Sequence, residues 1–161
     1  MAVLSQETMV QHSTELQKAG KKVVFTNGCF DIIHRGHIDL LKQAKRAGDH
    51  LYVAVNSDDS VRRLKGNNRP IQPAEDRAMI LDALASVDDV TIFHEDTPER
   101  LISMIKPNVL IKGADYKEDE IIGSELVQSW GGQVVRVPLV KRCGTEKILQ
   151  RILTTSRGEI A

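Results

Sequence analysis

The sequence predicts an α/β fold built on an open parallel sheet of five strands with helices on both faces. Short apolar runs alternate five times with segments of helical periodicity along the 161 residues. The apolar runs are unbroken instead of alternating with polar residues, a pattern typical of strands that helices cover on both faces. A chain of this length forms one domain, so we expect a single domain over residues 1–161.

The elements follow from these two patterns. Apolar side chains three and four residues apart predict helices at residues 4–19, 36–47, 73–87, 97–105, 123–130 and 145–153. Runs of β-branched and other apolar residues predict strands at residues 21–28, 51–57, 90–93, 109–113 and 133–138. We assign no element to the polar segment after residue 57, and we expect residues 154–161 to be a frayed tail.

Glycine, proline and one threonine mark the helix boundaries. Gly20 and Gly48 end the first two helices, because glycine readily adopts the conformation that follows a helix. Pro73 fits the start of the third helix, because proline lacks the N–H that the first turn leaves unpaired. Thr97 is the expected N-cap of the fourth helix, with Pro98 in its first turn.

Charge and cysteine content exclude several classes of function. Lys plus Arg and Asp plus Glu number 22 each, so the net charge is zero and offers no basic field for nucleic acid or an anionic membrane. Every apolar run is far shorter than the roughly 20 residues that span a bilayer. The two cysteines make no disulfide framework, and residues 1–20 show no secretory signal, so the cytoplasm is the expected compartment.

The densest polar cluster, TNGCFDIIHRGH at residues 26–37, leads from the first strand into the next helix. Ligands of open parallel sheets bind beyond the carboxyl ends of the strands, where this cluster lies. It lacks the G-x-x-x-x-G-K-[ST] of a P-loop and the G-x-G-x-x-G of a dinucleotide site. Instead, His34 and His37 flank Gly36 at a helix N-terminus. Backbone N–H groups and imidazole donors there suit the oxygens of a phosphoryl or nucleotidyl group.

Two other interpretations of this histidine pair stay open. The pair could ligate zinc, with a third ligand from Cys29, Cys143, His94 or Asp31, although the spacing matches no recognised zinc pattern. Alternatively, the two rings could cap the helix and satisfy buried polar groups. That structural interpretation is the one we apply to the other histidines, His12, His50 and His94.

The stretch GCFDIIHRGH resembles the G-x-F-D-x-x-H-x-G-H signature of the cytidylyltransferase-like nucleotidyltransferases. AVNSDDSVRRLKGNNRPIQPAEDR, EDTPERLI and VLIKGADY resemble the heptose 1-phosphate adenylyltransferase branch of that superfamily, so the likeness covers about residues 20–153. It implies a Rossmann-like nucleotidyltransferase fold. It also implies transfer of AMP from ATP to D-glycero-β-D-manno-heptose 1-phosphate, giving ADP-heptose and pyrophosphate for the lipopolysaccharide inner core. We expect a stand-alone form without the kinase domain that is often fused to this branch.

The resemblance also implies catalytic residues. His34 and His37 would contact the triphosphate and stabilise the transition state at the α-phosphorus. Lys65 and Arg77 would bind phosphate, unless they are ordinary surface charges. Lys112 could pair with phosphate or ribose oxygens, or could be merely structural. The attacking sugar phosphate is already ionised, so the reaction needs donors and positioning more than a general base.

Binding residues follow in the same way. Asp31 would fix the loop or meet the sugar substrate, and Arg69 is a further candidate for binding the sugar phosphate. The residues expected to line the nucleotide site are Thr26, Asn27, Gly28, Phe30, Gly36, Lys112, Gly113, Asp115, Gly144 and Thr145.

One stretch departs from the family pattern. The last helix usually opens with Ser-Thr-Thr or Ser-Thr-Ser, and this chain has Cys143, Gly144, Thr145 and Glu146 instead. Gly144 can still offer its N–H to a phosphate. Glu146 adds a negative charge near a polyanion unless it points away or approaches a metal.

Mg²⁺ is implied by the chemistry, because a divalent ion neutralises the leaving pyrophosphate. Phosphates and water hold most of its coordination sites, so we name no protein ligand. A homodimer is a family expectation, and the first helix, with Met9, Val10 and Leu16, could pack on its own domain or on a second subunit. The alternative functions are cytidylyl or adenylyl transfer to another small phosphate such as glycerol 3-phosphate, and nucleotide binding without activity.

Overall fold

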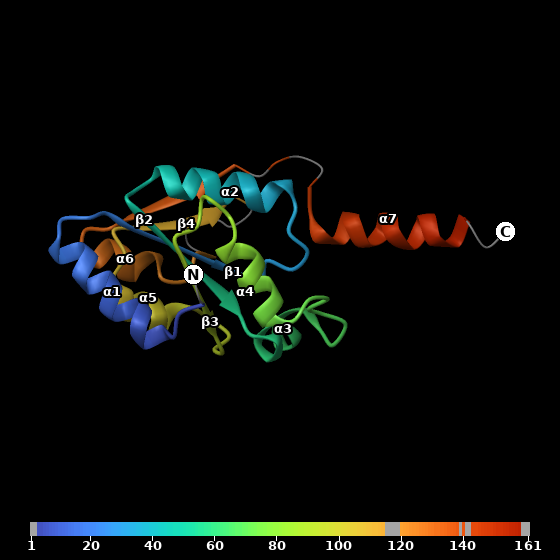
Figure 1. Cartoon of the computed structure of the whole chain (residues 1–161), viewed down its shortest axis with the longest axis horizontal. Coiled ribbons are helices and arrows are strands. Elements are labelled where there is room, and N and C mark those ends of the chain that lie inside the picture. Colours follow the sequence, from blue (N-terminus) through green and yellow to red (C-terminus); the bar gives the residue numbers. More distant parts are fainter. Residues whose placement is uncertain (1–2, 115–119, 139, 141–142, 159–161) are drawn as a thin grey trace.

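A five-stranded parallel sheet forms the centre of the computed structural model, which describes residues 3–114, 120–138, 140 and 143–158 (Figure 1). Its strands are β1 (Val23–Gly28), β2 (His50–Asn56), β3 (Asp89–Phe93), β4 (Val109–Gly113) and β5 (Gln133–Val137). They lie in the order β3-β2-β1-β4-β5, and every neighbouring pair is parallel. The predicted fold class and strands are confirmed. Because β2 and β3 lie on one side of β1 and β4 and β5 on the other, the topological switch point falls between β1 and β4.

The helices are α1 (Gln6–Lys18), α2 (Arg35–Arg46), α3 (Asp58–Lys65), α4 (Ala74–Asp82), α5 (Glu99–Ile105), α6 (Ser124–Ser129) and α7 (Thr145–Gly158). All six predicted helices are present. The polar segment after residue 57 contains a helix that the apolar pattern did not reveal, α3. The Ser57 side chain caps α3 by accepting the backbone N–H of Ser60, and Asp58 and Asp59 occupy the first turn, where negative charge is favourable.

Three predicted boundaries are wrong. α4 ends at Asp82 instead of residue 87, because the chain turns at Ala83. The N-cap of α5 is Pro98 and makes no side-chain hydrogen bond, so Thr97 does not cap this helix. α7 continues to Gly158, beyond the expected end near residue 153.

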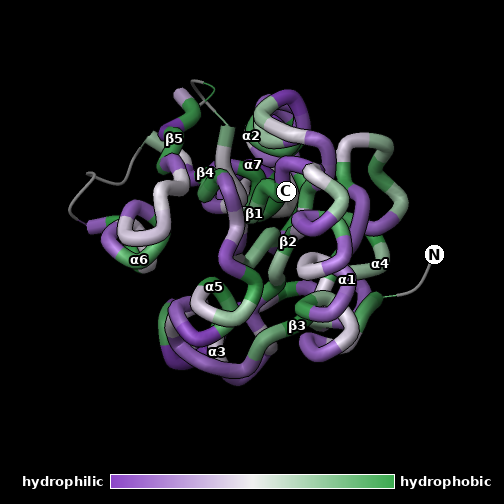
Figure 2. The backbone as a smooth tube through the Cα atoms, turned by 90° about the vertical axis from the view of Figure 1, so that its left-hand side faces the viewer, coloured by the Kyte–Doolittle hydropathy of each residue, from purple (hydrophilic) through white to green (hydrophobic). Residues whose placement is uncertain are grey.

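Helices cover both faces of the sheet, each over its own apolar cluster. On one face, α2 and α4 pack with Leu41 and Leu81 against strand residues such as Val24. On the other face, α1, α5 and α6 pack around strand residues such as Phe25. Successive side chains of β1 therefore enter opposite clusters, which explains why the strands are apolar without alternation. Figure 2 shows the hydrophobic segments gathered along the interior strands.

The N-terminal helix packs on its own chain. Met9 of α1 is fully buried in the cluster that contains Phe25, and Val10 and Leu16 pack against the same cluster. The N–H of Leu4 also donates to the carbonyl of Val90 at 2.8 Å. This arrangement decides between the two sites that the sequence left open for α1. α7 instead projects away from the sheet (Figure 1). None of the described helices has the length and apolar character needed to cross a bilayer.

Candidate active site

The loop between β1 and α2 lies at the carboxyl edge of the sheet and ends in a histidine cap. His34 is the N-cap of α2, and its Nδ1 accepts the backbone N–H of Gly36 at 3.1 Å. A neutral imidazole has one acceptor and one donor nitrogen, so His34 carries its proton on Nε2. Nδ1 of His34 therefore caps the helix, as the structural interpretation expects. Its Nε2–H remains a donor near the positive end of the helix.

His37 lies one helical turn further on and stacks against His34, with ring centroids 3.8 Å apart and planes inclined by 19°. Burial, with smaller contributions from the charges of His34 and Lys65, lowers the pKa of His37 to about 4. Burial also lowers the pKa of His34. Both rings are therefore neutral at pH 7 and can stack without charge repulsion.

The buried Nδ1 of His37 has no hydrogen-bond partner among the described residues. An unpaired N–H is rarer in protein interiors than an unpaired acceptor, which favours a bare Nδ1 and a proton on Nε2. Phe30 packs edge-on against this ring at a centroid distance of 5.3 Å and helps to hold its orientation. The pair thus presents two neutral Nε2–H donors on one helix.

Asp31 is fully buried in the same loop and is saturated by hydrogen bonds. Its carboxylate accepts Nε of Arg69 at 2.7 Å and the backbone N–H groups of Ile71 and Gln72 at 2.8 and 3.0 Å. Burial alone would raise the pKa of Asp31, but these bonds outweigh it and hold the pKa below its ordinary value. The geometry supports the loop-fixing alternative for Asp31, because both of its oxygens are occupied.

The residues on either side of Asp31 have strained backbones. Phe30 has φ 48° and Ile32 has φ 55°. Positive φ is unfavourable for a side chain with Cβ, especially a β-branched one, and costs about 1–3 kcal/mol per residue. Gln72 helps to hold this conformation, because its Oε1 accepts the N–H of Ile32 at 3.1 Å. Residues 69–72 therefore clamp the loop into the shape that aims the histidine helix.

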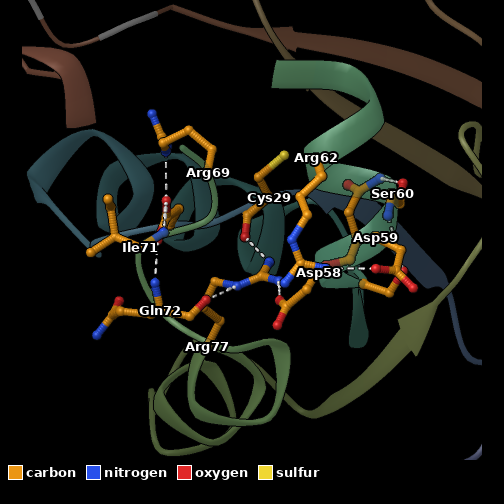
Figure 3. Close-up of polar contacts among 12 residues, drawn as sticks. Cys29, Asp58, Asp59, Ser60, Arg62, Arg69, Ile71, Gln72 and Arg77 are labelled. Atoms are coloured by element: carbon orange, nitrogen blue, oxygen red, sulfur yellow. Dashed lines mark hydrogen bonds and ion pairs between the residues drawn. The ribbon is translucent and has the colours of Figure 1, made fainter. Parts of the chain in front are cut away.

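Arg77 is fully buried beneath these loops (Figure 3). Its guanidinium donates to the carbonyls of Cys29 at 2.5 Å, Asn56 at 2.8 Å and Gln72 at 2.8 Å, and to the carboxylate of Asp58 at 2.7 Å. Direct contact with phosphate was expected of Arg77, with a surface position as the alternative. Neither fits a side chain with no exposed area, so we assign Arg77 a positioning role that ties the loops after β1 and β2 to the 69–72 segment.

Asn27 and Lys112 meet across the switch point. The Lys112 ammonium donates a hydrogen bond to the side-chain oxygen of Asn27, which joins the ends of β4 and β1. Thr26 is buried behind them, and its hydroxyl donates to the carbonyl of Ile111 at 3.0 Å. The structure thus brings Asn27 and Lys112 together, while the hydroxyl of Thr26 is used within the sheet.

The start of α7 reaches back to the histidine loop. The hydroxyl of Thr145 donates to the backbone carbonyl of Asp31 at 2.6 Å. Glu146 pairs with Nη1 of Arg69 at 2.6 Å, so Arg69 links two carboxylates, those of Asp31 and Glu146. This pairing offsets the charge that Glu146 brings to the site. Arg69 therefore already has two carboxylate partners within the protein.

The other predicted residues lie around the same edge. Gly36 lies against the His34 ring, because an added Cβ would be 3.1 Å from that ring and 3.4 Å from Cβ of Cys143. Lys65 ends α3 as an exposed cation whose charge acts on His37. Gly28, Gly113 and Gly144 lie at the ends of β1 and β4 and just before α7, and Asp115 lies outside the described residues.

Comparison with known proteins decides the family. Residues 25–151 match the cytidylyltransferase-like family. The chain belongs to this family. Bifunctional protein HldE of Salmonella arizonae is 49% identical over 154 residues, and the Salmonella enteritidis protein of the same name matches equally. These matches cover 96% of this chain and 32% of each relative, so the chain spans about a third of their length.

Solved structures agree with this membership. The lipopolysaccharide core biosynthesis protein of Thermoplasma volcanium is 33% identical, with a TM-score of 0.63, and the match covers 77% of this chain and all of that one. Pantoate-beta-alanine ligase of Francisella tularensis, in complex with beta-gamma ATP and beta-alanine, has a TM-score of 0.64 at 18% identity over 88% of this chain and 68% of its own. The second likeness concerns the fold alone.

Sequence reasoning missed Gln72, Asn56 and Asp58. Gln72 uses its side chain, N–H and carbonyl to contact Ile32, Asp31 and Arg77 respectively. The only local signal for Gln72 was its place just before a predicted helix start, and Asp58 could have been found as a first-turn acid after the Ser57 cap. As for the zinc interpretation, no third His, Cys, Asp or Glu among the described residues completes a metal cluster with His34 and His37.

The site of this cytidylyltransferase-like domain is a set of donors. Two neutral imidazole N–H groups lie at the N-terminal end of α2, with the cations of Lys65 and Lys112 at the same edge of the sheet. The carboxylates beside them are paired with arginines. Such an arrangement stabilises negative charge that develops on phosphate oxygens, and among the described residues it includes no base positioned to activate a nucleophile.

Proposed function

We propose that this protein transfers the AMP moiety of ATP to D-glycero-β-D-manno-heptose 1-phosphate and releases pyrophosphate and ADP-heptose. The observation that carries the reaction type is the neutral, stacked pair of His34 and His37 at the start of α2. The choice of sugar is supported by the identity to the HldE proteins and by the likeness to a lipopolysaccharide core biosynthesis protein.

In this proposal, an oxygen of the sugar phosphate attacks the α-phosphorus of ATP. The bond from that phosphorus to the bridging oxygen breaks, and pyrophosphate leaves with the electron pair. The Nε2–H donors of His34 and His37 bind the phosphate oxygens that gain charge in the transition state. A single preorganised donor of this kind contributes about 10²–10³-fold to kcat. Lys65 and Lys112 add positive charge, and Gly36 leaves room for the backbone to approach the phosphates.

Mg²⁺ is part of the proposal as the partner of ATP. The described carboxylates of the site do not fit a magnesium cage, because Asp31 and Glu146 are paired with Arg69 and Asp58 with Arg77. The remaining donors are mainly nitrogen, whereas Mg²⁺ prefers oxygen ligands. We therefore assign the ion to the phosphates and water and no step to a protein-bound metal. The requirement for the ion predicts activity that vanishes with excess chelator and returns with added Mg²⁺.

The proposed partners are ATP, the sugar 1-phosphate and a second copy of the chain. Of the two residues expected to meet the sugar phosphate, Asp31 is buried and has both oxygens occupied, so Arg69, which pairs with Asp31 at 2.7 Å, is the remaining candidate contact. Binding through Arg69 would therefore involve the donors that now face Glu146. Sedimentation of the purified protein tests the proposed homodimer. The proposed compartment is the cytoplasm, where ATP is available.

A substrate matrix tests the function. ATP and CTP are each offered with heptose 1-phosphate and with glycerol 3-phosphate, and pyrophosphate release is measured. The proposal predicts rapid release only with ATP and heptose 1-phosphate. If pyrophosphate release is faster with glycerol 3-phosphate or with CTP, the proposed substrate is wrong and the proposed reaction type stands. Tight ATP binding without pyrophosphate release in any combination would indicate a nucleotide-binding module instead of an enzyme.

A further inference from the structure

A second polar cluster lies at the opposite, amino-terminal edge of the sheet. It consists of His12 on α1, His50 at the start of β2 and Asp89 at the start of β3. A single oxygen, Oδ2 of Asp89, lies 2.8 Å from Nε2 of His50 and 3.1 Å from Nδ1 of His12. β2 runs from His50 to Asn56, so this cluster is roughly 20 Å from the histidine helix at the other edge.

The donor set suits a transition metal. Two imidazole nitrogens and one carboxylate oxygen lie within 4.8 Å of one another. In a tetrahedral zinc site with Zn–N near 2.0–2.1 Å, neighbouring ligand atoms are about 3.3 Å apart. Oδ2 of Asp89 lies 2.8 and 3.1 Å from the two imidazole nitrogens, close to this spacing, so small side-chain shifts would make room for the ion. Imidazole favours zinc and its neighbours in the first transition row, whereas Mg²⁺ and Ca²⁺ prefer sites built of oxygen alone.

An independent observation comes from Tyr52. This side chain is fully buried, and its hydroxyl has no hydrogen-bond partner among the described residues. Its ring centroid lies 4.6 Å from that of His50 and 6.0 Å from that of His12. His50 and Tyr52 are two residues apart on β2 and so face the same side of the sheet, toward α1. Buried hydroxyls are nearly always paired, so the orphaned group beside two imidazoles indicates a missing partner.

The charge around the cluster points the same way. Three carboxylates, those of Asp89, Asp88 and Glu15, lie around the Tyr52 side chain. Asp88 is paired with Lys45 at 2.6 Å. Among the described residues, the Asp89 carboxylate pairs only with the two imidazoles, and Glu15 lies one turn from His12 on α1. A bound cation would neutralise this negative charge, and its water could serve the Tyr52 hydroxyl.

We propose that His12, His50 and Asp89 form a binding site for a zinc-like divalent cation, with an open position for water next to Tyr52. The ion would join α1 to the first residues of β2 and β3. Its role is structural, because it lies at the edge of the sheet away from the proposed catalytic residues. Zinc binding would thus stabilise the folded chain by mass action without entering the reaction.

Calorimetric titration of the tag-free, chelator-treated chain with Zn²⁺ tests the site. We expect one equivalent bound with a Kd at or below about 1 μM, and a rise in Tm on addition of zinc. His12→Gln and His50→Gln should each weaken this binding by about 100-fold or more and abolish the rise in Tm. Co²⁺ in place of Zn²⁺ should give the visible absorption of a tetrahedral site in the unmodified chain.

Matched variants separate this site from the histidines at the other edge. His94→Gln removes an exposed histidine outside the cluster and should leave zinc affinity unchanged. The double variant His34→Gln/His37→Gln should also still bind one equivalent of Zn²⁺. Zinc binding that is lost in that double variant, or unchanged in both His12→Gln and His50→Gln, overturns the proposal. Absence of binding to the unmodified chain at 100-fold higher zinc overturns it as well, and leaves the triad as a hydrogen-bonded network.

Discussion

The ring of His34 caps α2 through Nδ1 and at the same time supports the ring of His37 by stacking. Each contact uses a different part of the imidazole, so the Nε2–H of His34 stays available to a ligand. The histidine that holds the helix start is thus also positioned to act on whatever binds there. Structure and chemistry at this point cannot be separated by an alanine substitution alone.

We predict that His37→Ala lowers kcat for pyrophosphate release by about 10²–10³-fold, because one preorganised donor is lost. His34→Asn should lower kcat on the same scale while retaining a side chain that caps helices well. His34→Ala should additionally lower the free energy of unfolding by about 1 kcal/mol, because the cap is lost. Lys42→Ala, an exposed change on the same helix, serves as the control. Near-normal kcat in both His37→Ala and His34→Asn would remove the assigned roles.

The stability of the protein should depend on His37 between pH 4 and 6.5. The pKa of His37 is lowered to about 4 in the folded chain from an ordinary value of 6.5, primarily by burial. The unfolded chain therefore binds more protons in this window, and stability falls as the pH falls through it. The loss amounts to about 3 kcal/mol at most. Urea unfolding at several pH values gives the free energy of unfolding as a function of pH. Between pH 4 and 6.5 this free energy should change less with pH in His37→Gln than in the unmodified chain, and an equal pH dependence would contradict the assignment.

Arg77→Ala should be among the most destabilising changes in the protein. It would leave the Asp58 carboxylate and the carbonyls of Cys29, Asn56 and Gln72 without their donor. Breaking a buried ion pair by removing one partner costs about 3–5 kcal/mol. Arg62→Ala removes an exposed arginine that pairs with Asp59 on the surface and should cost less than about 1 kcal/mol. Chemical denaturation measures both, and similar values for the two variants would refute the positioning role of Arg77.

The sheet and the histidine pair were predictable for local reasons. Unbroken apolar runs identify the strands, and the three-residue spacing of His34 and His37 places their rings on one helix face. The partners of Arg77 were not predictable, because its acceptors come from three segments that only the tertiary fold brings together. α3 was missed because Val61 is the only apolar residue that it buries, so capping and charge define it more than periodicity does.

The metal cluster was hidden from the sequence for a similar reason. His50 and Asp89 are adjacent only because β2 and β3 pair in the register that sets Tyr52 opposite Asp89. A shift of one residue would turn Asp89 to the other face of the sheet. His12 reaches them because α1 packs over this edge. The sequence shows neither neighbour of His12 and His50, so it indicates only a structural role for these two histidines.

Glu146→Gln tests the departure from the family at the start of α7. Glu146 is 77% exposed in its side chain and pairs with Arg69, so its removal should change the free energy of unfolding by less than about 1 kcal/mol. It should lower KM for ATP about two- to fivefold at low salt, because one negative charge is removed beside the triphosphate and Arg69 gains a free donor. The gain should shrink at high salt, where screening weakens the repulsion, and Glu125→Gln, at an exposed position of α6, should show none. A rise in KM for ATP would show instead that the carboxylate assists binding, and the offsetting role of Arg69 would then be wrong.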